Sequence, residues 1–279
     1  MDRRLTPATD RVALHSLHGL LERPEFSDGA PARVTAVVAD LRAAPDGARD
    51  RQLNFGADVT VIECRGAWTF VQAQRDHYVG WIAADALSAR DTELPAITHR
   101  VSAAATHIYS EPDMKRRELG RLSVNARLSV IGFEGEFAQL HTGGWVPVQA
   151  ISDRFSDDPV TLAESLLHTP YLWGGNSRDG IDCSGLVQAA LHGCGIACPG
   201  DADLQERAFE PVEDIRRGDL LFWPRHVAMA CGDGRMIHAT AWQMRVIHED
   251  IAQGIARIDA AGYGPMRGVR RAPDVAINL

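Results

Sequence analysis

Apolar and polar positions alternate over short runs in two segments of the chain, Val59–Leu87 and Leu128–Ile151. Such runs, broken by glycine, predict half-buried strands. The two segments also match one another, because each has a Gly-x-aromatic triplet followed by a Gly-Trp pair. The first copy has five more residues ahead of its Gly-Trp pair. The repeat therefore predicts two small all-β barrels, at residues 33–92 and 97–152.

Helical periodicity replaces this alternation on either side of the barrels. Residues 1–32 form a short leader, with a helical patch predicted around Val12–Leu21. After the second barrel, Ser156-Asp157-Asp158 stands directly before Pro159, which is a signal for the start of a helix. Leucines follow at helical spacing on one face. We therefore expect a further domain over residues 153–279 that opens with a helix.

A second helix is predicted after the stretch Asp182-Cys183-Ser184-Gly185, where apolar residues recur at helical spacing. Asp182 suits the N-cap position of this helix. Cys183 then lies in the first turn, where the helix macrodipole is expected to lower the pKa of its thiol. Free backbone N–H groups there can also hold a developing oxyanion. Cys183 is therefore a candidate nucleophile.

A predicted β-hairpin brings two histidines into play, with arms at 226–230 and 236–240. An odd number of connecting residues puts His226 and His238 on the same face. Three or five connecting residues centred on Gly232 would place them directly opposite one another, whereas a two-residue Asp-Gly turn would separate them. On a shared face, one imidazole can take the thiol proton while the other orients it.

Composition narrows the function classes. The 279 residues carry a formal net charge of −8 and no run rich in lysine and arginine, which argues against nucleic acid and anionic membranes as partners. No apolar run is long enough for a transmembrane helix, and the first residues lack the pattern of a secretion signal. Five cysteines without regular spacing indicate reduced thiols, so we expect a cytoplasmic protein. No cofactor is expected.

Three ordered motifs, YLWGG…DCSGLVQ, GDLLFW…HVAMA and MIHAT, resemble those of the NlpC/P60 superfamily of papain-like cysteine peptidases of bacterial cell-wall metabolism. The barrels look like bacterial SH3-like modules. Together they resemble the subgroup that cleaves γ-D-glutamyl-L-diamino-acid bonds in murein peptides. The implied fold is α+β, with a C-terminal papain-like cysteine peptidase domain behind two all-β SH3-like barrels. The implied substrate is a short murein peptide with a free N-terminal L-alanine, as met in cell-wall peptide recycling.

The resemblance also implies roles for individual residues. Cys183 corresponds to the nucleophile, His226 to the general base and His238 to the orienting residue. The implied substrate-binding residues are two aromatic side chains lining the cleft, two polar residues that receive the L-alanine amine, and a tyrosine that closes the same subsite: Tyr171 and Trp173, Asp182 and Ser184, and Tyr78. Relatives also place an acidic residue on the first barrel, for which Asp58 and Glu63 are both candidates.

Structural explanations compete with several of these roles. Tyr171 and Trp173 also suit apolar packing, N-capping alone accounts for Asp182, and Tyr78 also suits a loop anchor. The Cys194-x-x-x-Cys198 spacing near His192 lacks the four ligands of a structural zinc site, so no metal is expected.

Two other functions stay open from sequence alone. One is an amidase or acyltransferase that uses the same Cys-His pair, and the other is a non-catalytic module that binds peptides through its barrels. Lysine and diaminopimelate are both open as the diamino acid, as are the oligomeric state and the choice between free peptide and intact wall.

Overall fold

The computed structural model describes residues 1–88 and 93–273. The predicted boundaries at residues 92 and 279 lie outside this described part. The chain divides into two compact units, of which the first is Met1–His99, His107–Leu122 and Ala126–Val148, and the second is Arg100–Thr106, Ser123–Asn125 and Gln149–Leu279. Among the described residues, no helix has the length and apolar character needed to cross a membrane.

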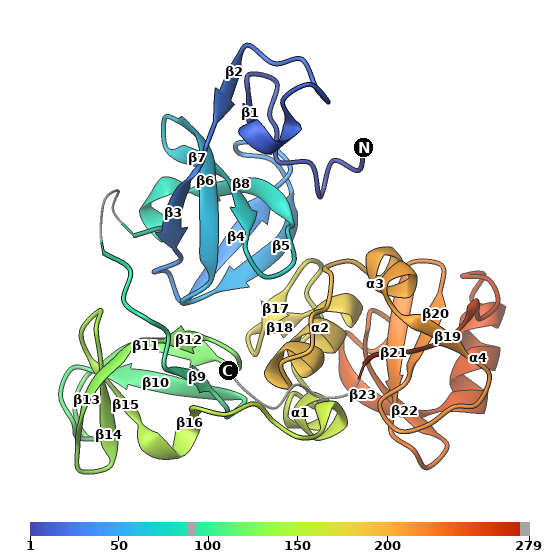
Figure 1. The fold of residues 1–279 in the computed structure, drawn as a ribbon. Coiled ribbons are helices and arrows are strands. Elements are labelled where there is room, and N and C mark those ends of the chain that lie inside the picture. Colours follow the sequence, from blue (N-terminus) through green and yellow to red (C-terminus); the bar gives the residue numbers. More distant parts are fainter. Residues whose placement is uncertain (89–92, 274–279) are drawn as a thin grey trace. The chain divides into compact units, whose positions relative to one another are not determined.

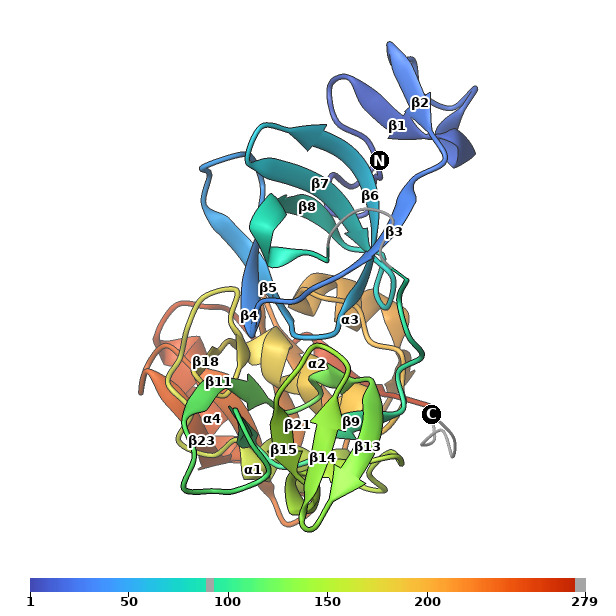
Figure 2. The same cartoon turned by 90° about the vertical axis from the view of Figure 1, so that its left-hand side faces the viewer.

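The leader is mostly extended. Strands β1 (Val12–Leu14) and β2 (Glu25–Ser27) pair in parallel, and only His15–Leu17 form a 3-10 turn. The predicted helical patch around Val12–Leu21 is therefore wrong. The reason is tertiary packing: Val12 is buried in a cluster with Ile62 of the first barrel, which an extended backbone allows. Figure 2 shows β1 and β2 at one end of that barrel.

The first barrel is a six-stranded sheet of order β3-β6-β7-β8-β4-β5. Its strands are β3 (Ala30–Arg33), β4 (Val38–Arg42), β5 (Arg49–Asn54), β6 (Asp58–Arg65), β7 (Trp68–Ala73) and β8 (Val79–Ala83). A 3-10 turn, Ala84–Ala86, follows β8. The rings of Phe70 and Trp81 meet in its core with centroids 5.3 Å apart, and Trp81 belongs to the Gly-Trp pair of the repeat.

The second barrel repeats this plan with shorter strands. They are β9 (His99–Val101), β10 (Ala105–Tyr109), β11 (Glu118–Ser123), β12 (Arg127–Leu128), β13 (Val130–Glu134), β14 (Phe137–Leu140), β15 (Trp145–Pro147) and β16 (Ile151–Ser152). A 3-10 turn, Val148–Ala150, follows β15 as in the first barrel. The main sheet has the order β11-β10-β15-β14-β13. The pairing register shifts after Val61 in β6 and after Val130 in β13, so the repeat preserves even its β-bulge.

The second unit contains a six-stranded antiparallel sheet of order β19-β24-β20-β21-β22-β23. Its strands are β19 (Glu210–Val212), β20 (Leu220–Trp223), β21 (His226–Ala230), β22 (Arg235–Thr240), β23 (Arg245–Asp250) and β24 (Gly268–Arg271). The helices are α1 (Pro159–Ser165), α2 (Cys183–Gly193), α3 (Ala202–Ala208) and α4 (Ile251–Ala260), and a short hairpin joins β17 (Asn176–Ser177) to β18 (Gly180–Ile181). The expected α+β class with preceding all-β barrels is confirmed.

Alternation along β21 separates the two faces of this sheet. Val227, Met229 and Cys231 belong to the hydrophobic cluster that includes α1 and α2. Ala228 and Ala230 belong to the cluster that includes α4. The two helices α2 and α4 accordingly lie on opposite sides of the sheet in Figure 1. The parity of a residue number in β21 therefore tells which helix its side chain meets.

Candidate active site

Helix α2 begins at Cys183, and its N-cap is Asp182, as the sequence predicts. The Asp182 carboxylate accepts hydrogen bonds from Gly185 N–H at 2.7 Å, Ser184 Oγ–H at 2.9 Å and Gly174 N–H at 2.9 Å. The structure thus brings Asp182 and Ser184 together beside the candidate nucleophile. Capping accounts for the position of the carboxylate, and its role toward a substrate amine stays a prediction.

The glycines of this motif allow backbone segments to approach one another closely. A Cβ atom added at Gly185 would lie 2.4 Å from the carbonyl oxygen of Gly175. One added at Gly175 would lie 2.5 Å from the carbonyl oxygen of Gly180. Neither contact is possible for a real side chain, because backbone atoms cannot move aside as a flexible side chain can. Both glycines therefore fix the loop against the start of α2.

The Cys183 thiol is neutral in this environment. Burial raises its pKa to about 12, with the charge of Asp182 acting in the same direction. Backbone N–H groups of Val227, Ser184 and Cys183 itself oppose this rise without overcoming it. The expectation that the helix start lowers this pKa is therefore wrong, because desolvation of the thiolate outweighs the helix N-terminus. The N–H group of Val227, the residue after His226, nevertheless lies beside the sulfur.

The hairpin that carries the two histidines has an odd connection, as a shared face requires. Cys231 N–H donates to the carbonyl of Arg235 at 2.8 Å, which leaves residues 232–234 as a three-residue loop. Gly232 and Gly234 in this loop have φ values of 93° and 80°, which glycine adopts without strain. The predicted same-face arrangement of the histidines is confirmed, since their rings are in contact.

The register of the hairpin differs from the predicted one. Strand pairing centres the loop on Asp233, one residue beyond the expected centre at Gly232. Continued along the strands, this register sets His238 across from Ala228 and diagonal to His226, so the expectation that they stand directly opposite is wrong. The small Ala228 leaves room for the diagonal reach, and His226 Nε2 lies 2.9 Å from His238 Nδ1.

The two imidazoles differ in exposure, because the His226 residue is only half-buried. His238 is fully buried, and the His226 ring lies with its centroid 5.8 Å from that of Trp223. The pKa of His226 is lowered to about 3, chiefly by burial and also by the neighbouring His238 and Arg257, while Glu249 acts in the opposite direction. A neutral imidazole is therefore the resting form of His226. It is able to accept a proton only as charge develops elsewhere in the site.

Glu249 is a residue of this site that sequence reasoning missed. Its Oε2 lies 3.1 Å from His238 Nε2, an ion-pair distance, although the N–H is not aligned for a linear hydrogen bond. Arg257 of α4 donates two hydrogen bonds of 2.7 Å to the same carboxylate, and its guanidinium lies 4.4 Å from the centroid of the Trp242 ring. The pairing of β22 with β23 brings it there, since Glu249 lies opposite Met236, two residues before His238 and on the same face.

The two predicted cleft aromatics differ in exposure. Tyr171 is half-buried and pairs through its backbone with Ile181. Burial raises the pKa of Tyr171, and the charges of Cys183 and Asp182 add to the rise, so this ring borders the nucleophile. Trp173 exposes 67% of its surface. Their roles in binding substrate stay predictions.

Tyr78 lies in the first unit, at the end of the loop between β7 and β8. Its side chain is buried, its N–H donates to Asp76 at 3.2 Å, and the Arg51 guanidinium lies 5.0 Å from its ring centroid. Arg51 in turn lies 3.2 Å from Asp76. These contacts anchor the loop, and the closing of a substrate subsite by Tyr78 stays a prediction.

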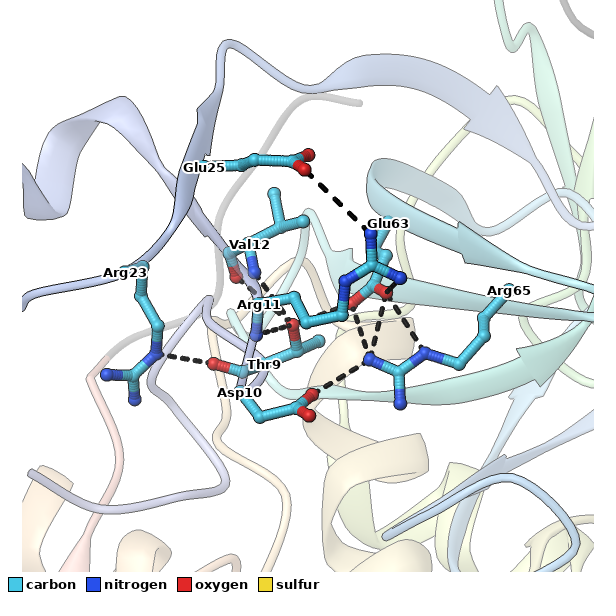
Figure 3. A network of polar contacts seen from close by, with 8 residues as sticks. All are labelled: Thr9, Asp10, Arg11, Val12, Arg23, Glu25, Glu63 and Arg65. Carbon is cyan, nitrogen blue, oxygen red and sulfur yellow. Dashed lines mark hydrogen bonds and ion pairs between the residues drawn. The ribbon is translucent and has the colours of Figure 1, made fainter.

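The two acidic candidates of the first barrel are both engaged within their own unit. Asp58 forms ion pairs with two arginines at 2.7 and 2.6 Å. Glu63 is buried and lies 2.9 Å from Arg65, and it accepts a hydrogen bond of 2.6 Å from Thr9 of the leader (Figure 3). Arg11 approaches the same carboxylate at 3.8 Å. These contacts attach the leader to the barrel.

One group of side chains has the donor types of a zinc site. Among the described residues, Glu164, Cys231 and His248 place ligand atoms within 4.8 Å of one another. His248 Nε2 already contacts Glu164 Oε1 at 3.1 Å. Arg235 and Arg217 bring positive charge toward Cys231. Because these guanidinium groups would repel a cation, the group is best described as a half-exposed hydrogen-bonded pair beside a buried thiol.

Comparisons with known proteins agree with this site. The model of the NlpC/P60 family matches residues 168–258, and that of the bacterial dipeptidyl-peptidase SH3 domain matches residues 41–87. The γ-D-glutamyl-L-lysine dipeptidyl-peptidases of Bacillus cereus and Bacillus subtilis are each 28% identical, over 68% and 70% of this chain and 67% and 73% of their own length.

Solved structures support the fold. The crystal structure of an NlpC/P60 family protein from Bacillus cereus superposes with a TM-score of 0.74 at 23% identity, covering 87% of this chain and 99% of that one. An NlpC/P60 endopeptidase from Photobacterium damselae gives 0.59 at 12% identity, covering 88% and 71%. The resemblance inferred from the motifs is confirmed: the chain is an NlpC/P60 cysteine peptidase homologue with a bacterial SH3 domain ahead of the peptidase domain.

Proposed function

We propose that the protein is a cysteine endopeptidase that hydrolyses the γ-D-glutamyl-L-diamino-acid bond of murein peptides with a free N-terminal L-alanine. The observation that carries this proposal is the hydrogen-bonded pair of Asp182 and Ser184 on either side of Cys183. A carboxylate beside a hydroxyl suits an ammonium group, because charge-assisted hydrogen bonds are the stronger ones. The similarity to dipeptidyl-peptidases that carry γ-D-glutamyl-L-lysine in their names supports the same substrate class.

The chemistry starts from a neutral thiol and a neutral imidazole. Because the pKa of Cys183 is raised to about 12 and that of His226 is lowered to about 3, a preformed ion pair is unfavourable before substrate binds. The thiol proton therefore passes to His226 as the sulfur attacks the carbonyl carbon. Backbone N–H groups at the start of α2 stabilise the oxyanion. His226 then protonates the leaving amine, and water releases the acyl group from Cys183.

The product test separates this reaction from its rivals. Incubation with L-Ala-γ-D-Glu-L-Lys, and with its diaminopimelate counterpart, should give L-Ala-D-Glu and the free diamino acid by mass spectrometry. An acyltransferase would instead need an added amine acceptor, and a peptide-binding module would leave both peptides uncut. Either of these results would overturn the proposal.

Acetylation of the substrate amine tests the amine site itself. By analogy with truncated charge pairs, loss of the charged contact between Asp182 and the substrate ammonium group costs on the order of 2–5 kcal/mol. We therefore expect kcat/KM to fall by roughly 30-fold to several thousand-fold for N-acetyl-L-Ala-γ-D-Glu-L-Lys. Equal values for the free and acetylated peptides would show that the amine is not recognised, and would favour intact wall peptides as substrate.

The proposal includes a cytoplasmic role in the recycling of imported peptides. The five cysteines are all free thiols, as a reducing compartment favours. Cell fractionation checks this part separately, since recovery outside the cytoplasm would argue for action on the wall while leaving the bond specificity unchanged.

A further inference from the structure

His238 lies between His226 and Glu249, and these two neighbours together favour one of its two neutral tautomers. Its Nδ1 lies 2.9 Å from His226 Nε2, and its Nε2 lies 3.1 Å from Glu249 Oε2. We propose that Glu249 is a positioning residue that keeps the proton of neutral His238 on Nε2, which leaves His226 with Nδ1 as its basic nitrogen. This inference rests on the proposed peptidase function and adds a fourth residue to the site.

The assignment follows from charge. Burial opposes ionisation of Glu249, but hydrogen bonds from Arg257 and the contact with His238 outweigh it and lower the pKa of this carboxyl to about 2. An ionised oxygen 3.1 Å from a bare nitrogen lone pair is repulsive, so Nε2 of His238 must carry the proton. Nδ1 of the neutral ring is then an acceptor.

The tautomer of His238 also determines the tautomer of His226. Since His238 Nδ1 accepts, His226 must donate from Nε2 across their 2.9 Å contact. A neutral His226 with its proton on Nε2 has its lone pair on Nδ1, and that lone pair is the base that the thiol of Cys183 needs. When His226 becomes an imidazolium during attack, the negative charge of Glu249 stabilises it through His238.

The fold holds Glu249 from the side of α4. Arg257 donates from Nε and from its terminal nitrogen to both carboxylate oxygens, a two-point contact that fixes the orientation of the group. Gly254, one turn earlier, makes the approach of α4 possible: a Cβ atom there would lie 2.2 Å from Met236 Cε and 3.1 Å from Glu249 Oε2. The exposed fraction of the Glu249 side chain is only 10%.

The chain offers a matched control on the other face of the same sheet. His248 Nε2 lies 3.1 Å from Glu164 Oε1, the same separation as in the pair of His238 and Glu249. The side chains of His248 and Glu164 are 23% and 35% exposed, and their described contacts do not include His226 or His238. Glu164→Gln therefore removes a similar contact from the same domain and leaves the contacts of His238 with Glu249 and His226 unchanged.

The first experiment needs no variant. In the ¹⁵N spectrum of the wild-type enzyme with labelled histidine, protonated and bare ring nitrogens have well-separated shifts. We expect His238 to be protonated at Nε2 and bare at Nδ1 near neutral pH, with its signals assigned by their loss in His238→Asn. The opposite tautomer in the folded wild type would overturn the proposal whatever the substrate is.

The second experiment measures Glu249→Gln against Glu164→Gln. The amide can present its NH₂ group to Nε2 and so favour the wrong tautomer, as loss of a triad carboxylate does elsewhere. We expect kcat to fall by about 10²- to 10³-fold in Glu249→Gln with KM little changed, and by less than about twofold in Glu164→Gln. Glu249→Asp keeps the charge and should restore part of the loss. Equal losses in the two glutamine variants would overturn the proposal.

A pH profile separates positioning from a structural effect. His238, Glu249 and Arg257 are the charged or titratable groups that influence the pKa of His226, and of these only Glu249 raises it. Its neutralisation should therefore move the acid limb of Cys183 alkylation by iodoacetamide to lower pH. If the substitution instead loosened the site and let water enter, the pKa of His226 would rise toward about 6.5 and the acid limb would move to higher pH. Because alkylation of Cys183 is followed by peptide mapping and needs no murein peptide, it also distinguishes failure of this inference from failure of the proposed substrate.

Discussion

A histidine–glutamate pair lies on each face of the sheet of the second unit. The two pairs have the same separation but differ in burial and in the third group beside the glutamate. His238 and Glu249 lie 3.1 Å apart on the α4 side with 0% and 10% of their side chains exposed. His248 and Glu164 lie 3.1 Å apart on the α1 side with 23% and 35% exposed. The two pairs are interleaved in sequence, because His248 and Glu249 are neighbours in β23 and point to opposite faces.

The difference teaches that distance alone does not define what such a pair does. A carboxylate in a buried site interacts strongly with its neighbours, whereas water and salt screen one at the surface. Glu249 also has Arg257 as a third partner, while the third group beside Glu164 is the Cys231 thiol. The buried pair is therefore able to fix a proton on His238, and the half-exposed pair is an ordinary surface contact worth about 0–1 kcal/mol.

The largest effect should come from the thiol of the candidate nucleophile, with a second thiol of the same hydrophobic cluster as its control. Cys183→Ser should abolish peptidase activity while the fold stays intact, because a serine hydroxyl passes its proton to an imidazole far less readily than a thiol does. Cys231→Ser, beside the half-exposed pair, should keep close to full activity. Product formation from L-Ala-γ-D-Glu-L-Lys measures both. More than a few per cent of wild-type rate in Cys183→Ser would contradict the assignment of the nucleophile.

The second largest difference between the two pairs should be in how each glutamate contributes to the free energy of unfolding as pH falls. The pKa of Glu249 is lowered from 4.5 to about 2 in the folded state, so its contribution to stability is present above pH 4.5 and is lost as pH falls through 2. At pH 7 we expect Glu249→Gln to lower the free energy of unfolding by about 2–3 kcal/mol, and Glu164→Gln by about 0–1 kcal/mol. Urea unfolding at several pH values checks this. A deficit in Glu249→Gln that stays constant down to pH 2 would show that the contact is not ionic.

Local signals explain how much of this site was open to prediction. Pro159 after an aspartate at the start of α1, and Asp182 at the start of α2, act within a few residues of themselves, so both helix starts were found. The shared face of His226 and His238 also followed, since it depends only on the parity of a short loop. The exact register did not, because either glycine of the loop sequence Gly232-Asp233-Gly234 can adopt positive φ.

Features that depend on tertiary packing could not be read in this way. Glu249 meets His238 only after β22 pairs with β23 and α4 folds back onto the sheet. The raised pKa of Cys183 depends on burial by segments distant in sequence, which a helix-start signal does not include. The helix predicted around Val12 was wrong for the same reason, because the contacts of Val12 with the first barrel are non-local.

Removal of the third partner should have a smaller effect than removal of Glu249. Arg257→Gln leaves the carboxylate in place but takes away the two hydrogen bonds that orient it. We expect kcat to fall about tenfold with KM unchanged, and Arg257→Lys to recover only part, since lysine keeps the charge without the two-point geometry. Steady-state kinetics on the free tripeptide measure this. Wild-type kcat in Arg257→Gln would show that Glu249 needs no support from α4.

The smallest effect should come from Gly254, which contacts the buried pair only through the space it leaves. In Gly254→Ala the new methyl group meets Met236 Cε, the flexible end of a side chain, and also presses on Glu249 Oε2 at 3.1 Å. Alanine favours the helix by about 1 kcal/mol, which offsets most of the packing cost, so stability should change by less than about 1 kcal/mol.

For Gly254→Ala, the activity should change although the stability changes little. Displacement of Glu249 from His238 should lower kcat by a few-fold, because the carboxylate is pushed rather than removed. Ala256→Gly, on the exposed side of the same helix, reports helix propensity alone, and should lower stability by about 1 kcal/mol with kcat unchanged. If Gly254→Ala instead lost stability and kept full kcat, the glycine would serve the packing of α4 on Met236, and the position of Glu249 would tolerate movement.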